Sequence, residues 1–479
     1  MSLNTVLSKF PKTFWVANTI ELFERWAWYG FFALFANYLT GSSDQGGLEL
    51  TQSDKGWIMG VGTAILYFLP VITGAIADRL GYRKTLFIAF LVYISAFLLF
   101  PHADSFIGVF GVYLYLALGA ALFKPIISAT IAKVSTEETS SIAFGIFYMM
   151  VNIGAFIGPL LTLTTKSEPN NIFYISAFII SLNFILLYFY NEPEKEENVI
   201  KGSIGQSVVH IFKNIGQVFQ DIKFVMFLLI IAGFWTMYNQ LFFTLPVFIT
   251  QWVDTTSLYH WFATHFPEIS NTYGDAATQT MQAEFIVNSD AMFIILFQII
   301  ISSIVMKWKA LNAMMSGFVV CATGMALTLY TQNVYFTIGA ILIFAIGEMS
   351  SSPKITEYIG MIAPSDKKAL YMGYSFIPVF LGNLFAGFIG GDLYGKWSDK
   401  ATIVKQFATE KGIAVSSTLS QNEYFHAVAQ KMNLSDMELT NLLWNEYSPS
   451  KIWIVIYGIG IFSVVALFLY NRFILNKSK

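Results

Sequence analysis

The stretch Gly74-Ala-Ile-Ala-Asp78-Arg79-Leu-Gly81-Tyr-Arg83-Lys84 joins two long apolar segments of the chain, at about 55–77 and 85–101. Its glycines permit a tight turn in which backbones approach closely, and we expect Asp78 to pair with the neighbouring arginines. Each flanking segment has about the length that a helix needs to cross the hydrocarbon core of a bilayer. The stretch therefore predicts a short charged loop between two membrane helices.

The composition of the 479-residue chain is that of a membrane protein. Apolar residues make up 55%, aromatic residues 17% and charged residues only 12%, a balance that soluble globular proteins do not show. The formal net charge of −2 leaves no basic surplus for binding nucleic acid. Because Cys321 is the one cysteine, disulfides within the chain and multi-cysteine metal sites are excluded. We expect neither nucleic acid nor a metal ion as a partner.

Apolar segments long enough to span a bilayer recur twelve times. They run at about 14–39, 55–77, 85–101, 106–131, 141–164, 171–190, 223–250, 285–306, 310–331, 335–361, 370–394 and 451–475. The first has no small-residue cleavage site, so we expect it to remain as a helix. Most lysines and arginines outside the helices lie in the connections on the side of the termini, whereas the short opposite loops hold only Lys55 and Lys166. Both termini are therefore expected in the cytoplasm.

The sequence predicts an all-α membrane protein of twelve transmembrane helices in two six-helix bundles. The first bundle covers 1–190, and a cytoplasmic linker over 191–222 has apolar residues spaced for an interfacial helix. The second bundle covers 223–479 and includes an external loop at about 395–450. Two capping-box patterns, Ser420 with Glu423 and Ser435 with Glu438, predict a small helical hairpin in this loop. We expect it to cap the outer mouth, and a partner-binding role is the alternative.

The stretch quoted first resembles the signature loop of the major facilitator superfamily, G-x-x-x-D-R-x-G-x-R-K. The corresponding loop after the eighth helix, Lys307-Trp-Lys309, keeps only the positive charge. The resemblance implies two six-helix bundles that move about a central site near the bilayer midplane. A merely cationic loop is the alternative interpretation.

Ionisable residues inside the helices are candidates for function, since each is costly in a bilayer unless it faces a cavity or a partner. There are eight, namely Glu21, Glu24, Arg25, Lys124, Asp290, Glu348, Lys354 and Glu357. Glu21, Glu24 and Arg25 share one helix face, and counting along the helices places Lys124 at a similar depth. Such a cluster can hold a proton whose affinity changes when a substrate carboxylate competes for Arg25 or Lys124. A static charge network that locks two helices together is the alternative.

Several motifs resemble those of the proton-dependent oligopeptide transporters. Glu21-Leu-Phe-Glu24-Arg25-Trp26-Ala-Trp28-Tyr29 is similar to the E-x-x-E-R-F-x-Y-Y motif of that family, with aromatic exchanges at two positions. The likeness extends to nearly all twelve helices, through Tyr67, Phe123-Lys124-Pro125, Phe144-Gly-Ile-Phe147-Tyr148-Met-Met-Val-Asn152-Ile-Gly154-Ala-Phe156 and Glu348-Met-Ser-Ser-Ser352-Pro353.

This resemblance implies a role for each matching residue. Glu21, Glu24 and Arg25, with Lys124, would couple proton movement to substrate movement, and the two cations would hold a peptide carboxylate. Glu348, with Asn152, would bind the peptide amino terminus. The residues implied to contact substrate are Arg25, Tyr29, Tyr67, Lys124, Asn152, Asn239, Asp290, Glu348 and Ser352.

Three positions depart from the family pattern. Phe32 stands where an arginine is usual, and Asn239 stands where an acid is usual, so both partners of an expected salt bridge are missing together. Asp290 replaces an asparagine. It is either a second proton site or a contact for a basic group of the substrate. The remaining alternative is that it accepts a hydrogen bond from Asn239 or from a nearby backbone amide.

Lys354 and Glu357 lie one turn apart on the cytoplasmic part of the tenth helix. They are predicted either to form an ion pair that closes an inner gate or to be a pair at the helix end that reaches toward the lipid headgroups.

The predicted function is a proton-coupled symporter that imports di- and tripeptides by alternating access. It is not an enzyme and needs no cofactor, because the proton gradient drives it. We expect a monomer in the plasma (inner) membrane, with protons, a small peptide and the lipid bilayer as partners. One alternative is a proton-coupled transporter of another peptide-like solute, such as a modified amino acid. The other is a membrane receptor or scaffold that does not transport.

Overall fold

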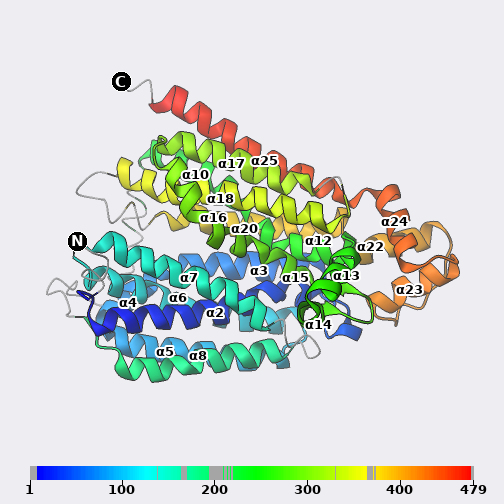
Figure 1. Cartoon of the computed structure of the whole chain (residues 1–479), viewed down its shortest axis with the longest axis horizontal. Helices are drawn as coiled ribbons and strands as arrows, with labels where there is room; N and C mark the ends of the chain where they lie inside the picture. Colours follow the sequence, from blue (N-terminus) through cyan, green and yellow to red (C-terminus); the bar gives the residue numbers. More distant parts are fainter. Residues whose placement is uncertain are drawn as a thin grey trace. The chain divides into compact units, whose positions relative to one another are not determined.

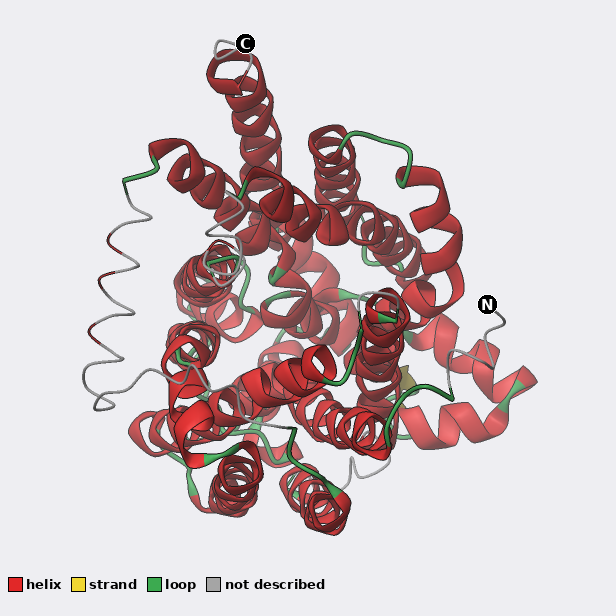
Figure 2. Ribbon diagram, turned by 90° about the vertical axis from the view of Figure 1, so that its left-hand side faces the viewer, coloured by secondary structure: helices red, strands yellow, loops and turns green. Residues whose placement is uncertain are grey.

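The computed structural model of the chain describes residues 8–136, 139–162, 170–193, 220–328, 331–363 and 374–475, and the isolated positions 209, 213, 216 and 371. Nearly all of this part is helical (Figure 2). The strands β1 (Gly274–Asp275) and β2 (Thr280–Met281) form one short antiparallel hairpin, with Gly274 opposite Met281. The predicted interfacial helix of the 191–222 linker falls mostly outside the described residues.

The chain folds into two compact units. Unit 1 comprises Met1–Phe32 and Gly62–Val225, and unit 2 comprises Ala33–Val61 and Met226–Lys479. The later part of the first membrane helix and the first part of the second therefore pack with unit 2.

Unit 1 is built from apolar helices of membrane-spanning length. Its elements are α2 (Lys12–Thr40) up to Phe32, the end of α3 (Gln52–Phe68), α4 (Pro70–Leu80), α5 (Tyr82–Leu99), a 3₁₀ turn (Phe100–His102), α6 (Phe106–Lys133), α7 (Ser140–Thr162) and α8 (Asn171–Phe189). Helix α5 packs against both α6 and α8, and α5 and α8 run side by side in Figure 1.

The charged loop that opened the sequence analysis connects α4 to α5 through Gly81. Its φ angle of +93° lies in a region that side chains disfavour, which explains the glycine. The Glu192 carboxylate accepts hydrogen bonds from the amides of Tyr82 (2.8 Å) and Arg83 (3.3 Å) at the start of α5. Asp78 accepts a hydrogen bond from the Tyr82 hydroxyl (3.1 Å). Among the described residues it forms no ion pair with an arginine, so the predicted pairing is wrong.

Unit 2 contains the end of α2, the start of α3 and the remaining helices. Its main elements are α10 (Ile222–Tyr238), α11 (Gln240–Phe243), α12 (Leu245–Trp252), α13 (Thr256–His265), α14 (Pro267–Tyr273), α15 (Ala283–Val287), α16 (Ser289–Val305), α17 (Ala310–Leu327), α18 (Val334–Ile362), α20 (Phe376–Phe388), a π-helix (Ile389–Leu393), α21 (Tyr394–Trp397), α22 (Lys400–Glu410), α23 (Gln421–Lys431), α24 (Asp436–Tyr447) and α25 (Ile452–Leu469), which ends in a π-helical turn (Tyr470–Leu475). Two 3₁₀ turns, Ser43–Gln45 and Pro449–Lys451, complete it. Helix α18 packs against α16 and α17, and α17 packs against α25.

The helices account for the predicted membrane spans. Ten described helices are long and apolar enough to cross a bilayer, and the pair α3 and α4, bent by 44°, makes an eleventh. Helix α2, whose apolar run is interrupted by Glu21, Glu24 and Arg25, brings the number to the predicted twelve.

Within unit 2, glycines bring α3 into close contact with α20. A Cβ atom on Gly56 would lie 2.3 Å from the carbonyl oxygen of Gly387, and one on Gly387 would lie 2.4 Å from that of Gly56. Any larger side chain would force the helices apart, so the small residues set their separation.

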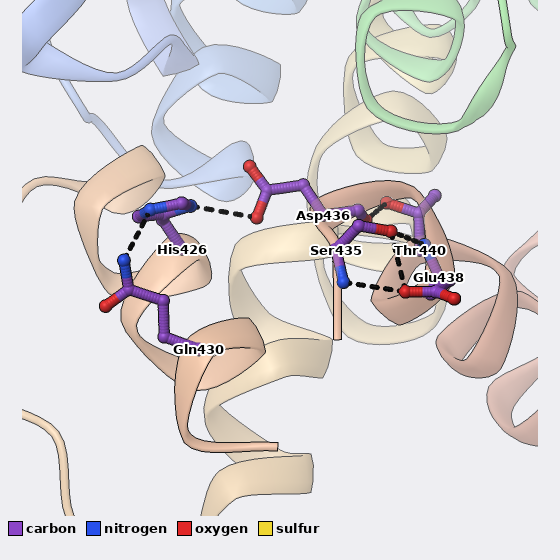
Figure 3. Close-up of polar contacts among 6 residues, drawn as sticks. All are labelled: His426, Gln430, Ser435, Asp436, Glu438 and Thr440. Carbon is purple, nitrogen blue, oxygen red and sulfur yellow. Dashed lines mark hydrogen bonds and ion pairs between the residues drawn. The ribbon is translucent and has the colours of Figure 1, made fainter. Parts of the chain in front are cut away.

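The segment predicted to be an external hairpin contains three helices, because α22 precedes α23 and α24. Both predicted capping boxes are confirmed. Ser420 and Glu423 cap the N-terminus of α23, and Ser435 and Glu438 cap the N-terminus of α24. Figure 3 shows the second of these, together with His426 Nδ1, which lies 3.1 Å from Asp436 Oδ1 and links α23 to α24. The short helices α13 and α14 were not predicted.

Candidate transport site

The predicted cluster on α2 is formed and buried within unit 1. The Nε atom of Arg25 lies 2.5 Å from Glu24 Oε2 and 3.3 Å from Glu21 Oε1. The exposed fractions of Glu21, Glu24 and Arg25 are 5%, 0% and 8%. One guanidinium contacts two buried carboxylates and can neutralise only one of them, so the second acid needs a proton or a further cation nearby.

Tyr93 of α5 is a member of this cluster that the sequence analysis missed. Its buried hydroxyl donates a short hydrogen bond to Glu24 Oε1. Glu24 is thereby bound on one oxygen by Tyr93 and on the other by Arg25. Glu21 makes the longer of the two contacts with Arg25, so it is the carboxylate held less firmly.

Lys124 of α6 lies beside the cluster and has a different kind of partner. Its Nζ atom is 3.9 Å from the centre of the Tyr67 ring, a cation–π contact, and its charge interacts with those of Glu21, Glu24 and Arg25. No acid of the described chain lies within ion-pair distance of it. The guanidinium carbon of Arg25 lies 5.9 Å from the Tyr29 ring centre. The structure thus brings Lys124 to the three charged residues of α2, as predicted, and places Tyr29 and Tyr67 against the two cations.

Asn152 of α7 is turned toward its own helix, because its amide donates to the backbone oxygen of Tyr148 (2.8 Å). Ser352 of α18 is half-buried. Their predicted contacts with substrate remain predictions.

In unit 2, Glu348 of α18 and Asp290 of α16 form a second acidic group. The Tyr238 hydroxyl donates to Glu348 Oε1 (2.8 Å), whereas Glu348 Oε2 is buried without a hydrogen-bond partner. Asp290 is 6% exposed, its Oδ1 has no partner, and its charge interacts with that of Glu348. The buried amide nitrogen of Asn239 also has no partner, so Asn239 does not supply the hydrogen bond to Asp290 considered above.

Other charged residues of the helices lie outside these two groups. Lys354 Nζ lies 2.8 Å from Glu357 Oε2, so the predicted local pair is formed, with Lys354 buried and Glu357 about half exposed.

Lys55 was expected in an outer loop. This expectation is wrong, since Lys55 lies in the first turn of α3 and is 1% exposed. Glu284 of α15 was missed. It is buried and accepts a hydrogen bond from Asn37 (2.6 Å).

Metal binding has no candidate site in the described part of the chain, where no three His, Cys, Asp or Glu side chains gather closely enough to hold an ion.

The chain is similar in sequence to known membrane transporters. The sequence profile of the Major Facilitator Superfamily matches residues 15–256. The peptide transporter YePEPT of Yersinia enterocolitica is 24% identical over 446 residues, which cover 78% of this chain and 86% of that protein. An uncharacterized transporter of Bacillus subtilis, YclF, is 26% identical over 163 residues, and this match spans only 33% of either protein.

Solved structures agree with the sequence comparison. The crystal structure of a POT family transporter in complex with 5-aminolevulinic acid superposes with a TM-score of 0.69 at 18% identity, covering 98% of this chain and 97% of that one. These likenesses confirm the resemblance that was drawn from the helix motifs. The chain belongs to the major facilitator superfamily.

Proposed function

We propose that this protein is a proton-coupled symporter that imports di- and tripeptides. Several relatives, among them YePEPT and the di-/tripeptide transporter of Lactococcus lactis, are named as peptide transporters, and the second is 26% identical over 175 residues. The observation that carries the proposal is the buried group of Glu21, Glu24 and Arg25 beside Lys124. A proton-coupled transporter needs acids whose protonation depends on a nearby cation that substrate can occupy.

The proposed coupling step follows from the contacts. When a peptide carboxylate binds Arg25 or Lys124, it competes with Glu21 and Glu24 for positive charge. The acid that loses its share of positive charge takes up a proton more readily, since burial disfavours an uncompensated carboxylate. Glu21 is the candidate, because its contact with Arg25 is the longer one and Glu24 is also bound by Tyr93. Substrate and proton would then cross together.

We propose that residues of opposite charge bind the two ends of a peptide. Unit 1 carries the cations Arg25 and Lys124, and unit 2 carries the acids Asp290 and Glu348. We propose that the first pair binds the carboxylate and that Glu348 binds the amino terminus. This assignment predicts that a free carboxylate and a free amine are both recognised.

The test is to separate exchange from accumulation in proteoliposomes. Glu21→Gln should abolish accumulation driven by a pH gradient but leave exchange of labelled for unlabelled dialanine largely intact. A permanently neutral side chain still allows the substrate-loaded protein to alternate between its two conformations. Glu24→Gln should do the same if both acids share the proton. Glu268→Gln in α14 is the matched control, since Glu268 is exposed, and it should accumulate dialanine normally.

Full gradient-driven accumulation by both Glu21→Gln and Glu24→Gln would overturn the coupling assignment. A wild-type protein that exchanges no peptide at all would overturn the function.

A second candidate substrate class is a peptide-like solute other than a peptide. The observation that favours it is that Phe32 and Asn239 are uncharged where the family usually has an arginine and an acid, which changes the polar side chains available near the predicted substrate contacts. Uptake of dialanine and of 5-aminolevulinic acid, measured under the same pH gradient, distinguishes the two classes.

A further inference from the structure

We propose that Asp290 and Glu348 together bind two positive charges of one substrate, so that the protein selects peptides with a basic side chain. Glu348 would take the amino terminus, and Asp290 would take a lysine or arginine side chain. This inference rests on the proposed function and names the substrate class of the same site.

The first step of the argument is that no cation of the described residues pairs with the two acids. Asp290 lies in the first turn of α16 and Glu348 lies in α18, and their charges interact. Among the described residues, no lysine, arginine or histidine forms an ion pair with either acid. Two buried carboxylates without a cation are costly, so the pair must hold protons or wait for a positively charged ligand.

The second step is that the hydrogen bonds available from the protein do not satisfy the pair. Glu348 receives one, from Tyr238, and its other oxygen is buried and unpartnered, as is Asp290 Oδ1. The residue after Tyr238 is Asn239, which is 7% exposed and whose amide nitrogen also lacks a partner. A buried donor and buried acceptors that stay unpaired with one another have capacity for a polar ligand.

The third step is the aromatic environment of Tyr238. The Tyr238 ring that hydrogen-bonds Glu348 contacts four other rings. The centre-to-centre distances are 4.9 Å to Trp235, 5.5 Å to Phe344, 6.0 Å to Phe234 and 6.2 Å to Phe242. The faces of aromatic rings attract ammonium and guanidinium groups.

The fourth step concerns the stem of a basic side chain. One turn beyond Asp290, Ile294 packs with Met349, the neighbour of Glu348, and Phe293 and Phe297 pack against them. Apolar surface beside an acid suits lysine and arginine, whose methylene groups can contact it while the charged end reaches the carboxylate.

The experiment compares two peptides that differ only in charge. Purified full-length protein in proteoliposomes takes up labelled dialanine, and alanyl-lysine or alanyl-norleucine competes with it. Norleucine has a stem similar to that of lysine but no charge. We expect alanyl-lysine to compete at about tenfold lower concentration. Asp290→Asn should abolish this preference, so that alanyl-lysine and alanyl-norleucine compete at about the same concentration.

Two further variants control for folding and charge. Asp290→Glu should keep the preference for lysine, because it keeps the carboxylate. Asp104→Asn makes the same chemical change at an exposed position between the 3₁₀ turn and α6, and it should behave as wild type.

Three results would overturn the inference, namely equal competition by the two peptides in wild type, equal weakening of both by Asp290→Asn, and a shift of pH optimum for both peptides with the preference intact. The last would make Asp290 a proton site only. Thermal stabilisation of the purified protein by alanyl-lysine over alanyl-norleucine measures binding without transport. The inference therefore stands or falls separately from symport.

Discussion

At the scale of single residues, Arg25 and Lys124 carry the same charge but have different partners. Arg25 is engaged by Glu21 and Glu24, whereas Lys124 rests on the Tyr67 ring without an ion pair in the described chain. A substrate carboxylate that binds Lys124 exchanges a cation–π contact for a charged hydrogen bond. One that binds Arg25 must displace a carboxylate already present. Under the proposed coupling, Lys124 would be the easier first contact and Arg25 would transmit binding to the acids.

This difference yields a prediction about the carboxylate end of the peptide. Lys124→Ala and Arg25→Ala should each weaken binding of a dipeptide with a free carboxylate by roughly 10- to 100-fold, the value of about 1.5–3 kcal/mol for a charged hydrogen bond. The amidated dipeptide should lose little further in either variant. Competition against labelled dialanine measures both, and Lys133→Ala, an exposed lysine of the same helix, should leave both affinities unchanged. Equal losses for the free and amidated peptides would show that neither cation contacts the carboxylate.

Charged residues of the site could be predicted from the sequence, and their aromatic partners could not. Glu21, Glu24, Arg25 and Lys124 are conspicuous because an ionisable residue in an apolar helix needs a reason to be there. Tyr93 gives no such signal in a chain with 24 tyrosines and 46 phenylalanines. Whether its hydroxyl meets an acid depends on how α5 is turned against α2, which periodicity does not determine.

At the scale of elements, helix α23 is attached at its first turn to the loop that follows α2, within unit 2. Glu49 Oε1 accepts a hydrogen bond from the Gln421 amide (2.9 Å), and Ser42 Oγ accepts one from the Asn422 amide (3.0 Å). Amides at a helix start have no partner inside the helix, and a carboxylate there is favourable. Burial alone would raise the pKa of Glu49, but hydrogen bonds from the Gln421 and Ser43 amides outweigh it and lower that pKa below the usual 4.5.

The lowered pKa gives this attachment a pH dependence. Because the folded-state pKa is depressed, Glu49 contributes stability above its unfolded pKa of 4.5, and that contribution is lost as the pH falls through the folded value. We expect hydrogen exchange in α23 to quicken as the pH is lowered from neutral to about 3.5, after correction for intrinsic rates. Glu49→Gln should cost about 1 kcal/mol of local stability at neutral pH and remove most of this dependence.

Glu268→Gln is the matched control for that experiment and should preserve the pH dependence, since Glu268 is exposed on α14. Unchanged exchange in Glu49→Gln would show that the carboxylate does not stabilise the start of α23.

Elements with strong local signals were predicted, and those without them were missed. The twelve long apolar segments and both capping boxes of the external helices read directly from residue type and spacing. Helices α13, α14 and α22 have 10, 7 and 11 residues and a mixed composition. Helices this short owe their stability to packing with other parts of unit 2, so the local sequence carries little evidence of them.

At the scale of the whole molecule, the two packing units do not coincide with the first six and the last six helices of the sequence. Ala33–Val61 packs with unit 2 although it lies among the first helices of the chain. Its contacts include the glycines of α3 against α20 and the bond from Asn37 to Glu284. Counting helices predicts how many there are. It does not predict which unit each half of a helix contacts, because that depends on residues far away in the sequence.

The orientation of the chain in the membrane is the remaining whole-molecule prediction. The distribution of lysine and arginine places both termini and the α4–α5 loop in the cytoplasm, and α22 to α24 outside. The native Cys321 is fully buried, so a membrane-impermeant maleimide should not label the unmodified protein. Ser417→Cys, at an exposed position between α22 and α23, should be labelled in intact cells. Lys84→Cys, exposed at the start of α5, should be labelled only after the membrane is permeabilised. The reverse pattern would place the termini outside and overturn the predicted orientation, but an inward proton gradient would still drive import, because a symporter moves proton and peptide in the same direction in either orientation.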